Sequence, residues 1–285
     1  NWSLPHIGTL AAKGILGGNP DRTFRPEKNI TRAETIVMLD IALDVQAVSY
    51  NKAGIYGPEE GLETISNDAA INVPGVTLRN MVIEGNLYLN EGIGEGDATL
   101  DNVTVKGKTI VRGGGEHSIH LINFTCKEVM LIKVNGRVRI VASGSTDIAE
   151  LILQSGAHVE GSGIETVTIL KPGEEIILDG DFDEVIIEAE VKTEISEDTT
   201  INDLKINSDA EVELAKGATV NNLTLDGAAM ITGKGTIEKA EINADGAKLE
   251  IEPKDYKVAE GVTAEVGGKE VKGVHKERPS GGGGG

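Results

Sequence analysis

Apolar residues recur at fixed offsets through most of the chain. In the first copy of the pattern, offsets 0, 3, 5, 9 and 11 hold the apolar residues Leu78, Met81, Ile83, Leu87 and Leu89. Further copies, looser from the fifth onward, start at Leu100, Leu121, Ile148, Ile164, Phe182, Ile201, Val220 and Ile237. The separations between starts are 22, 21, 27, 16, 18, 19, 19 and 17 residues. Repetition at this period is typical of a protein built from stacked structural units.

Each copy reads as two short strands joined by tight turns. Apolar and polar residues alternate with a period of two, as in residues 103–106 (VTVK) and 204–207 (LKIN). Gly, Asn, Asp and Ser, which favour turns, lie between the strands. The pattern predicts a mainly β chain that folds as a parallel β-helix (β-solenoid) of about nine coils stacked roughly 4.8 Å apart. A β-sandwich, the alternative, would need hairpins and a mirrored spacing.

The repeat also predicts the direction of particular side chains. Offset 2 is asparagine in three successive copies, at Asn80, Asn102 and Asn123, which predicts an Asn ladder from coil to coil. The alternative is the ordinary preference of Asn for turns. Offsets 0, 3 and 5 stay apolar in every copy and are expected to point into the solenoid. Cys126, at offset 5, is then expected to be buried and unreactive.

Residues 1–47 show a helical period instead. Apolar residues recur at helical spacing at Ile7, Leu10, Ala11 and Ile15, and Gly17 and Gly18 end the pattern. A polar loop follows, and a second helix is expected from Thr31. Thr31 can cap this helix while Glu34, three residues later, reaches back to complete a capping box.

This N-terminal segment resembles the S-layer homology module of Gram-positive cell envelopes. The resemblance rests on Trp2, which opens the first helix, and on residues 14–21 (GILGGNPD), 23–26 (TFRP) and 30–34 (ITRAE). It implies anchoring to secondary cell-wall polysaccharide, with Arg32 lining the glycan groove. Trp2 and Asp21 are the other candidate glycan-binding residues that the resemblance implies.

For Arg32 and Glu34 a surface ion pair combined with a helix cap is the alternative interpretation. The chain departs from the family in two respects. It carries one module where the family usually has three, and Arg22 stands where the family usually has Gly. A single module, expected to be the last of a truncated set, is predicted to bind the glycan weakly or not at all by itself.

Five parts are expected along the chain. They are an S-layer homology module at 1–47, a connector with the N-terminal cap of the solenoid at 48–77, the β-solenoid at 78–252, C-terminal capping strands at 253–274 and a Gly-rich linker at 275–285. Within the C-terminal cap, residues 256–258 and 262–266 are expected to form a closing strand pair. Span 53–275 also resembles the β-helical regions that follow such modules in clostridial-type surface proteins, through residues 103–107 and 112–120.

Composition narrows the classes of partner. The net charge of −19 argues against binding nucleic acid or an anionic membrane surface. The single cysteine excludes an internal disulfide and a cysteine-based metal site. The longest apolar runs are too short to cross a bilayer, so no membrane insertion is expected.

Catalysis has to be considered because right-handed β-helices often belong to polysaccharide lyases and glycoside hydrolases. One candidate cluster consists of Arg112, Glu116, His117 and His120, and the other of Asp179, Asp181, Asp183 and Glu184. Neither matches the polygalacturonase motifs, and sugar-stacking aromatic residues are scarce. We interpret the first cluster as a polar Gly-rich loop and the second as a solvated turn, so no catalytic residue is predicted.

Acidic residues are concentrated in one region. Residues 181–214 hold twelve acidic and two basic side chains, a net charge of −10. Carboxylates of this density could bind Ca²⁺, but no calcium-loop spacing is present. An outward acidic face that keeps the strand stack soluble is the favoured interpretation, and no cofactor is predicted.

Together these features predict a non-catalytic, extracellular surface protein of a Gram-positive-type cell wall or S-layer. Its module would bind secondary cell-wall polysaccharide, and its solenoid would act as a rigid spacer or lattice element. Self-association in a surface lattice or filament is a further expectation. A polysaccharide lyase or glycoside hydrolase on the same scaffold and an adhesin are the alternatives.

Overall fold

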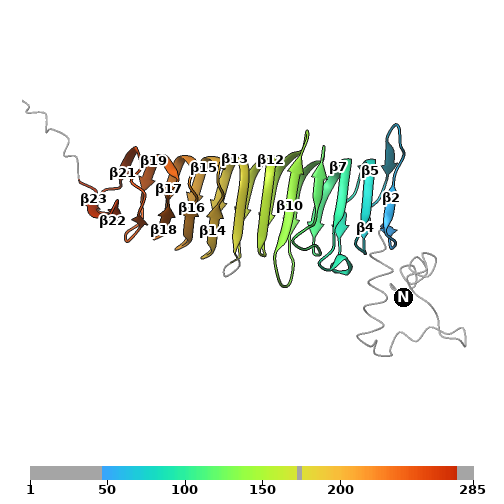
Figure 1. The fold of residues 1–285 in the computed structure, drawn as a ribbon, viewed down its shortest axis with the longest axis horizontal. Coiled ribbons are helices and arrows are strands. Elements are labelled where there is room, and N and C mark those ends of the chain that lie inside the picture. Colours follow the sequence, from blue (N-terminus) through green and yellow to red (C-terminus); the bar gives the residue numbers. More distant parts are fainter. Residues whose placement is uncertain (1–46, 172–174, 275–285) are drawn as a thin grey trace, which may run out of the picture. The chain divides into compact units, whose positions relative to one another are not determined.

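The computed structural model describes residues 47–171 and 175–274. Contacts divide the chain into two compact units, Asn1–Ala47 and Val48–Gly285. The second unit is a stack of short strands whose order in space follows the sequence (Figure 1). The expected helix cap at Thr31 and Glu34 and the expected linker at 275–285 lie outside the described residues.

The strands are two to fourteen residues long, as expected for coils with tight corners. The first half contains β1 Val48–Tyr50, β2 Gly54–Tyr56, β3 Glu63–Ile65, β4 Ala69–Ile71, β5 Val76–Ile83, β6 Leu87–Leu89, the 3-10 helix η1 Glu91–Ile93, β7 Ala98–Val111, β8 His120–Ile122, β9 Thr125–Leu131, β10 Val138–Ser143, β11 Asp147–Leu153 and β12 Ala157–Ile169. The second half contains β13 Ile176–Ile187, β14 Lys192–Ile195, β15 Thr200–Ile206, β16 Glu211–Leu214, β17 Thr219–Leu225, β18 Met230–Gly233, β19 Thr236–Ile242, β20 Lys248–Leu249, β21 Asp255–Val258, β22 Thr263–Val266 and β23 Lys269–Lys272.

Parallel pairing between successive coils confirms the β-solenoid, which has about 11 turns. Each strand pairs with the strand one coil later, as β13 does with β15 and β15 with β17. The stacked strands begin at β1, which pairs in parallel with β4. One coil, β2 to β4, and the single strand β1 therefore precede the first repeat seen in the sequence. These strands lie within the span expected to cap the solenoid, and at three residues each they are too short to show the apolar offsets of the later copies.

The core is a column of apolar side chains running through the whole stack. Offsets 0, 3 and 5 are buried in all copies, which confirms the predicted inward direction. Phe124 and Phe182 are the largest fully buried side chains. Cys126 is 3% exposed, which confirms its predicted burial, and this burial raises the pKa of its thiol.

The repeat pattern in the sequence predicts the wrong register between the third and fourth copies. Ile148 stacks on Cys126 and not on Leu121, so the separation of 27 residues becomes a regular 22. Likewise Val129 and Leu131, not their neighbours at 130 and 132, continue the inner ladder of β7. The register shifts beyond Val105, where β9 has one residue fewer than β7.

Along one ladder of stacked residues the side chains become smaller, which explains why the apolar pattern restarts at a different position in the coil. The ladder that begins with Leu78, Leu100 and Leu121 continues through Ala142, Gly161 and Gly180. At Gly161 a Cβ would lie 1.8 Å from the carbonyl oxygen of Ala142, and φ is +105°. Leucine cannot occupy this corner in the later coils, so the apolar pattern restarts from another ladder.

The C-terminal end closes with a β-hairpin. β22 and β23 pair antiparallel around Gly267 and Gly268, which adopt φ of +58° and +74°. Two consecutive left-handed glycines suit the tight two-residue hairpin turn. The expected pairing of residues 256–258 with 262–266 is wrong, because β21 and β22 each pair in parallel with the preceding coil.

Candidate functional site

The glycan-binding candidates Arg32, Trp2 and Asp21 lie outside the described residues. The described residues therefore show only what the solenoid can contribute. Within 47–171 and 175–274 no helix is long and apolar enough to cross a membrane.

The first polar cluster is dispersed by the coil geometry. The Arg112 guanidinium lies 5.6 Å from the centre of the Tyr88 ring and 4.0 Å from Glu91 Oε1. Glu116 lies 3.7 Å from Arg137 on the next coil. The His120 ring bonds the backbone oxygen of His117 at 3.0 Å. These side chains satisfy separate neighbours and do not converge on a common point.

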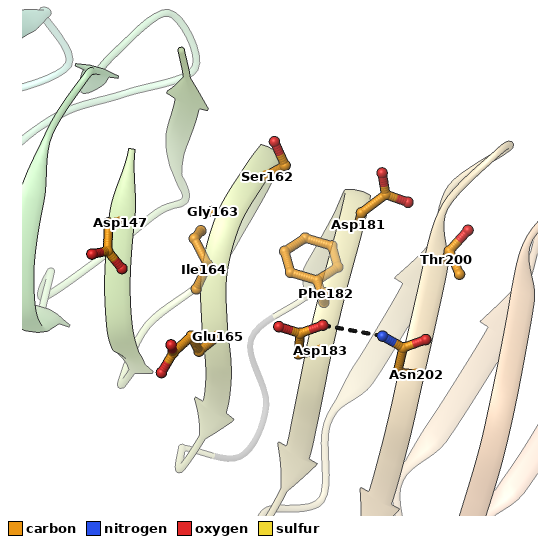
Figure 2. A pocket seen from close by; sticks show the side chains of 10 residues that line it. All are labelled: Asp147, Ser162, Gly163, Ile164, Glu165, Asp181, Phe182, Asp183, Thr200 and Asn202. Carbon is orange, nitrogen blue, oxygen red and sulfur yellow. Dashed lines mark hydrogen bonds between the residues drawn. The ribbon is translucent and has the colours of Figure 1, made fainter. Parts of the chain in front are cut away.

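The second acidic cluster lies beside a shallow depression on the outer surface (Figure 2). Its volume is about 340 Å³. Acidic side chains from three neighbouring strands line it: Asp147, Glu165, Asp181 and Asp183. The depression lies where the β12–β13 register shifts between Gly161 and Ile164, and Gly163 is among the residues that line it.

Neighbouring polar groups engage two carboxylates of this cluster. Asp183 Oδ1 accepts a hydrogen bond from the Asn202 amide at 3.1 Å, and Glu184 pairs with Lys205 at 2.5 Å. Asp179 lies on the β12–β13 ladder opposite Glu160, outside the depression. Among the described residues no three His, Cys, Asp or Glu side chains are arranged to hold a metal ion. The depression therefore presents an array of oxygen acceptors without a basic group beside them.

A tighter charged cluster lies on the β10–β12 face, and the sequence pattern did not reveal it. Arg139 binds Glu160 through two nitrogens, with Nη2 2.6 Å from Oε2, and His158 Nε2 lies 3.2 Å from Glu160 Oε1. The hydrogen bond from Arg139 holds the pKa of Glu160 below its usual range, although burial opposes this effect. The same bond raises the pKa of Arg139. Arg139 lies opposite His158 on the neighbouring coil and 21 residues before Glu160. The cluster can therefore be recognised only when the register of β10 against β12 is known.

Buried Lys133 ties together the loops of three coils. Its Nζ lies 2.6 Å from Glu95 Oε1 and 2.7 Å from the carbonyl oxygen of Gly114. The side chain is 9% exposed. A buried ammonium ion needs such partners, so this lysine stabilises the loops and is not free to act on a ligand.

Asparagines link coils at several places. Asn102 Nδ2 donates to Asn80 Oδ1 at 2.7 Å, whereas Asn123 Oδ1 accepts from the backbone N–H of Ser145. All three of these asparagines have φ between +51° and +54°, a left-handed conformation that Asn tolerates. A second series, Asn51–Asn72–Asn90, is joined by amide bonds of 2.8 and 2.7 Å.

Comparison with protein-family models matches residues 1–36 to the S-layer homology domain. The chain carries an S-layer homology domain. The matched span contains the glycan-binding candidates Trp2, Asp21 and Arg32 as well as Thr31 and Glu34. This agrees with the resemblance carried by the sequence pieces at 14–21, 23–26 and 30–34.

Two curated relatives are similar over part of the chain. A cellulosome-anchoring protein of Acetivibrio thermocellus is 43% identical over 44 residues, which is 15% of this chain and 10% of the relative. The outer membrane protein SlpA of Deinococcus radiodurans is 24% identical over 108 residues, 38% of this chain and 9% of the relative. The aligned segments thus cover about a tenth of the length of either relative. No solved structure matches the chain.

Proposed function

We propose that this chain is a non-catalytic surface protein that the S-layer homology domain anchors to secondary cell-wall polysaccharide. Arg32, Trp2 and Asp21 are the proposed glycan contacts, since a guanidinium pairs well with anionic sugar substituents. The observation that carries the proposal is the domain match at residues 1–36, followed by a solenoid that begins at Val48. The name of one relative, a cellulosome-anchoring protein, describes the same kind of role.

The solenoid then serves as a rigid spacer. Its strands pair in parallel from coil to coil, and the β22–β23 hairpin covers the last coil. Continuous pairing makes each coil depend on its neighbours, so the stack resists bending more than a chain of separate domains would. We place the protein outside the cell, at a Gram-positive-type wall.

Binding of the full chain to purified cell-wall polysaccharide tests the anchoring. We expect weak binding, because one module supplies only part of the groove that the family builds from three. Arg32→Ala should abolish it, whereas Arg137→Ala, which removes the same charge from the solenoid, should leave it unchanged. Tight binding that survives Arg32→Ala would contradict the proposed contact.

Hydrolysis or lyase activity is the competing function, and the acidic depression is the place where it would occur. A reducing-sugar assay on acidic polysaccharides should give no release above background. Release of reducing sugar that disappears in Asp181→Asn and in Asp183→Asn would show that the solenoid is catalytic and would contradict the proposed spacer role.

A further inference from the structure

One outer surface of the solenoid is mostly apolar over five successive coils, with one threonine among four large apolar residues. The outward residues in the middle of this surface are Ile110, Met130, Ile152, Thr168 and Ile186, stacked on one another from β7 to β13. All five are partly exposed. Tyr88 of β6 precedes Ile110 in this row, and its ring is covered by the Arg112 guanidinium. The same row is polar farther along the stack, at Lys205, Thr224, Glu241 and Lys257. The apolar part, which we call the apolar stripe, is therefore a local feature and not a property of the repeat.

Two rows of outward residues flank the apolar stripe. On one side they are Lys108, Glu128, Glu150, Thr166 and Glu184. On the other side they are Arg112, Ile132, Gln154, Leu170 and Glu188, whose backbone N–H groups bond the coil before. Leu170 is 42% exposed. Each row has a basic residue at the β7 end and a carboxylate at the β13 end, and the first row also holds Glu128 and Glu150 between them. Within one copy Lys108 pairs with Glu128 at 2.7 Å and Glu184 with Lys205 at 2.5 Å.

We propose that two copies of this chain pair through the apolar stripe, face to face and with their solenoid axes antiparallel. A two-fold axis along the strand direction at Ile152 brings each Ile152 opposite its counterpart. The same operation places the β7 end of one copy against the β13 end of the other. Both flanking rows then face their own reversed order, as an isologous interface requires.

Charge complementarity selects this arrangement. In the antiparallel pair Lys108 lies opposite Glu184 of the second copy, and Arg112 lies opposite Glu188. The apolar flank residues Ile132 and Leu170 also face each other. Glu150 faces its own counterpart at the two-fold axis, which is the one like-charge contact between the flanking rows of the antiparallel pair. In a parallel pair each flanking row would face the other flanking row of the second copy, coil by coil. Lys108 would then meet Arg112, and Glu184 would meet Glu188. Like charges at both ends would oppose that pairing.

The size of the surface sets the strength of the contact. Five coils and five residues of strand correspond to a surface of about 24 Å by 16 Å. This is smaller than the interface of a stable dimer. The pair is therefore weak and reversible in solution, and is favoured where copies are concentrated on a surface.

Sedimentation of the full chain at increasing concentration measures the association. We expect the average mass to rise toward that of a dimer. Ile152→Arg at the two-fold axis should lower the association constant at least tenfold. Thr224→Arg, the same residue type placed in the same row outside the apolar stripe, should leave it unchanged. A monomer at all concentrations, or association that survives Ile152→Arg, would overturn the proposal.

Charge exchange and cross-linking test the orientation. Arg112→Glu alone should weaken association, and the double variant Arg112→Glu/Glu188→Arg should restore it. A mixture of the Ile110→Cys and Ile186→Cys proteins should form a disulfide-linked dimer under mild oxidation, while either protein alone should not. Native Cys126 is buried and should not contribute. Efficient cross-linking of Ile110→Cys with itself would indicate parallel pairing and reject the antiparallel pair.

Discussion

The coils before and after residue 175 use the same parallel ladders but connect their outer surfaces differently. In the first region, contacts reach across two coils: Lys133 binds Glu95, and Arg137 binds Glu175, each 38 residues away. Among the described residues of the second region, up to residue 274, side-chain contacts join adjacent coils, at separations of 17 to 19 residues for the amide–carboxylate bonds. In the first region the loops differ in length, so single side chains such as Lys133 and Arg137 join them. In the second region the coils are nearly equal in length, so equivalent positions lie directly above one another.

Equal coil length has an electrostatic cost that the second region reduces with asparagine. Stacked positions of like charge repel, and Glu194 lies directly opposite Glu213. Elsewhere an amide follows a carboxylate: Asn202 donates to Asp183 at 3.1 Å, and Asn207 donates to Glu188 at 2.8 Å. The bonds Asn222–Asp203 and Asn243–Asp226 repeat this arrangement. An acidic surface can thus be stacked without stacking carboxylate on carboxylate at every position.

The largest effect should come from the core that both regions share. Phe124 and Phe182 are buried in the first and second regions respectively, so truncation to alanine leaves a cavity in either. We expect Phe124→Ala and Phe182→Ala each to lower the free energy of unfolding by about 3–5 kcal/mol. Urea denaturation measures this, with the surface variant Thr224→Ala as the control. A loss below about 1 kcal/mol at only one site would show that the two regions are not packed to the same density.

Two buried threonines of the second region provide a matched pair. The hydroxyl of Thr193 is buried without a hydrogen-bond partner, whereas Thr199 Oγ1 accepts from Gly180 N–H and donates to the carbonyl oxygen of Leu178. Replacing an unpartnered hydroxyl removes a desolvation cost, so Thr193→Val should raise the free energy of unfolding by about 1 kcal/mol. Thr199→Val should lower it by about 1–2 kcal/mol, because the Gly180 N–H loses its hydroxyl acceptor, although the Leu178 oxygen keeps its bond from the Ser196 N–H. Opposite signs in thermal or urea unfolding are the expected result, and equal signs would contradict the assigned bonds.

The ion pair of the first region should appear in the pH dependence of stability. Arg139 lowers the pKa of Glu160 in the folded protein below its ordinary value of 4.5. Stabilisation by this carboxylate is therefore complete above about pH 5 and is lost as the pH falls through the lowered pKa. Glu160→Gln should cost about 1 kcal/mol at pH 7 and progressively less toward pH 3. Glu165→Gln, on the same strand but exposed, should show no such trend. A cost that does not change with pH would assign the loss to packing instead of charge.

The sequence predicts the fold correctly where the same residue types recur in every coil, and incorrectly where the number of residues between equivalent positions changes. The inward ladders could be predicted because Val, Ile and Leu mark them in every coil. The change of corner near residues 142–180 could not, because Ala142, Gly161 and Gly180 continue a ladder of leucines without resembling it. The Arg139–Glu160 pair and the apolar stripe were missed for a related reason. Both depend on which residues lie opposite each other, and this requires the register and not only the period.

The smallest expected effect concerns salt and the acidic coils at 181–214. Remaining repulsion, as between Glu194 and Glu213, should be screened by added salt, so the melting temperature should rise smoothly by about 2–4 °C with NaCl. Asn202→Asp inserts a carboxylate directly against Asp183 and should make this salt dependence steeper, because it replaces an amide–carboxylate bond with a like-charge contact. Asn80→Asp, in the first region and away from these coils, is the matched control and should change the slope less.

Ca²⁺ should stabilise no more than Mg²⁺ at equal ionic strength, since screening does not distinguish two divalent ions of equal charge. A specific site would instead give stabilisation that saturates above its dissociation constant. Melting curves with and without chelator at fixed ionic strength separate the two behaviours. A drop on chelation that Ca²⁺ restores and Mg²⁺ does not would make the acidic coils a calcium site and remove repulsion as the feature that separates the two regions.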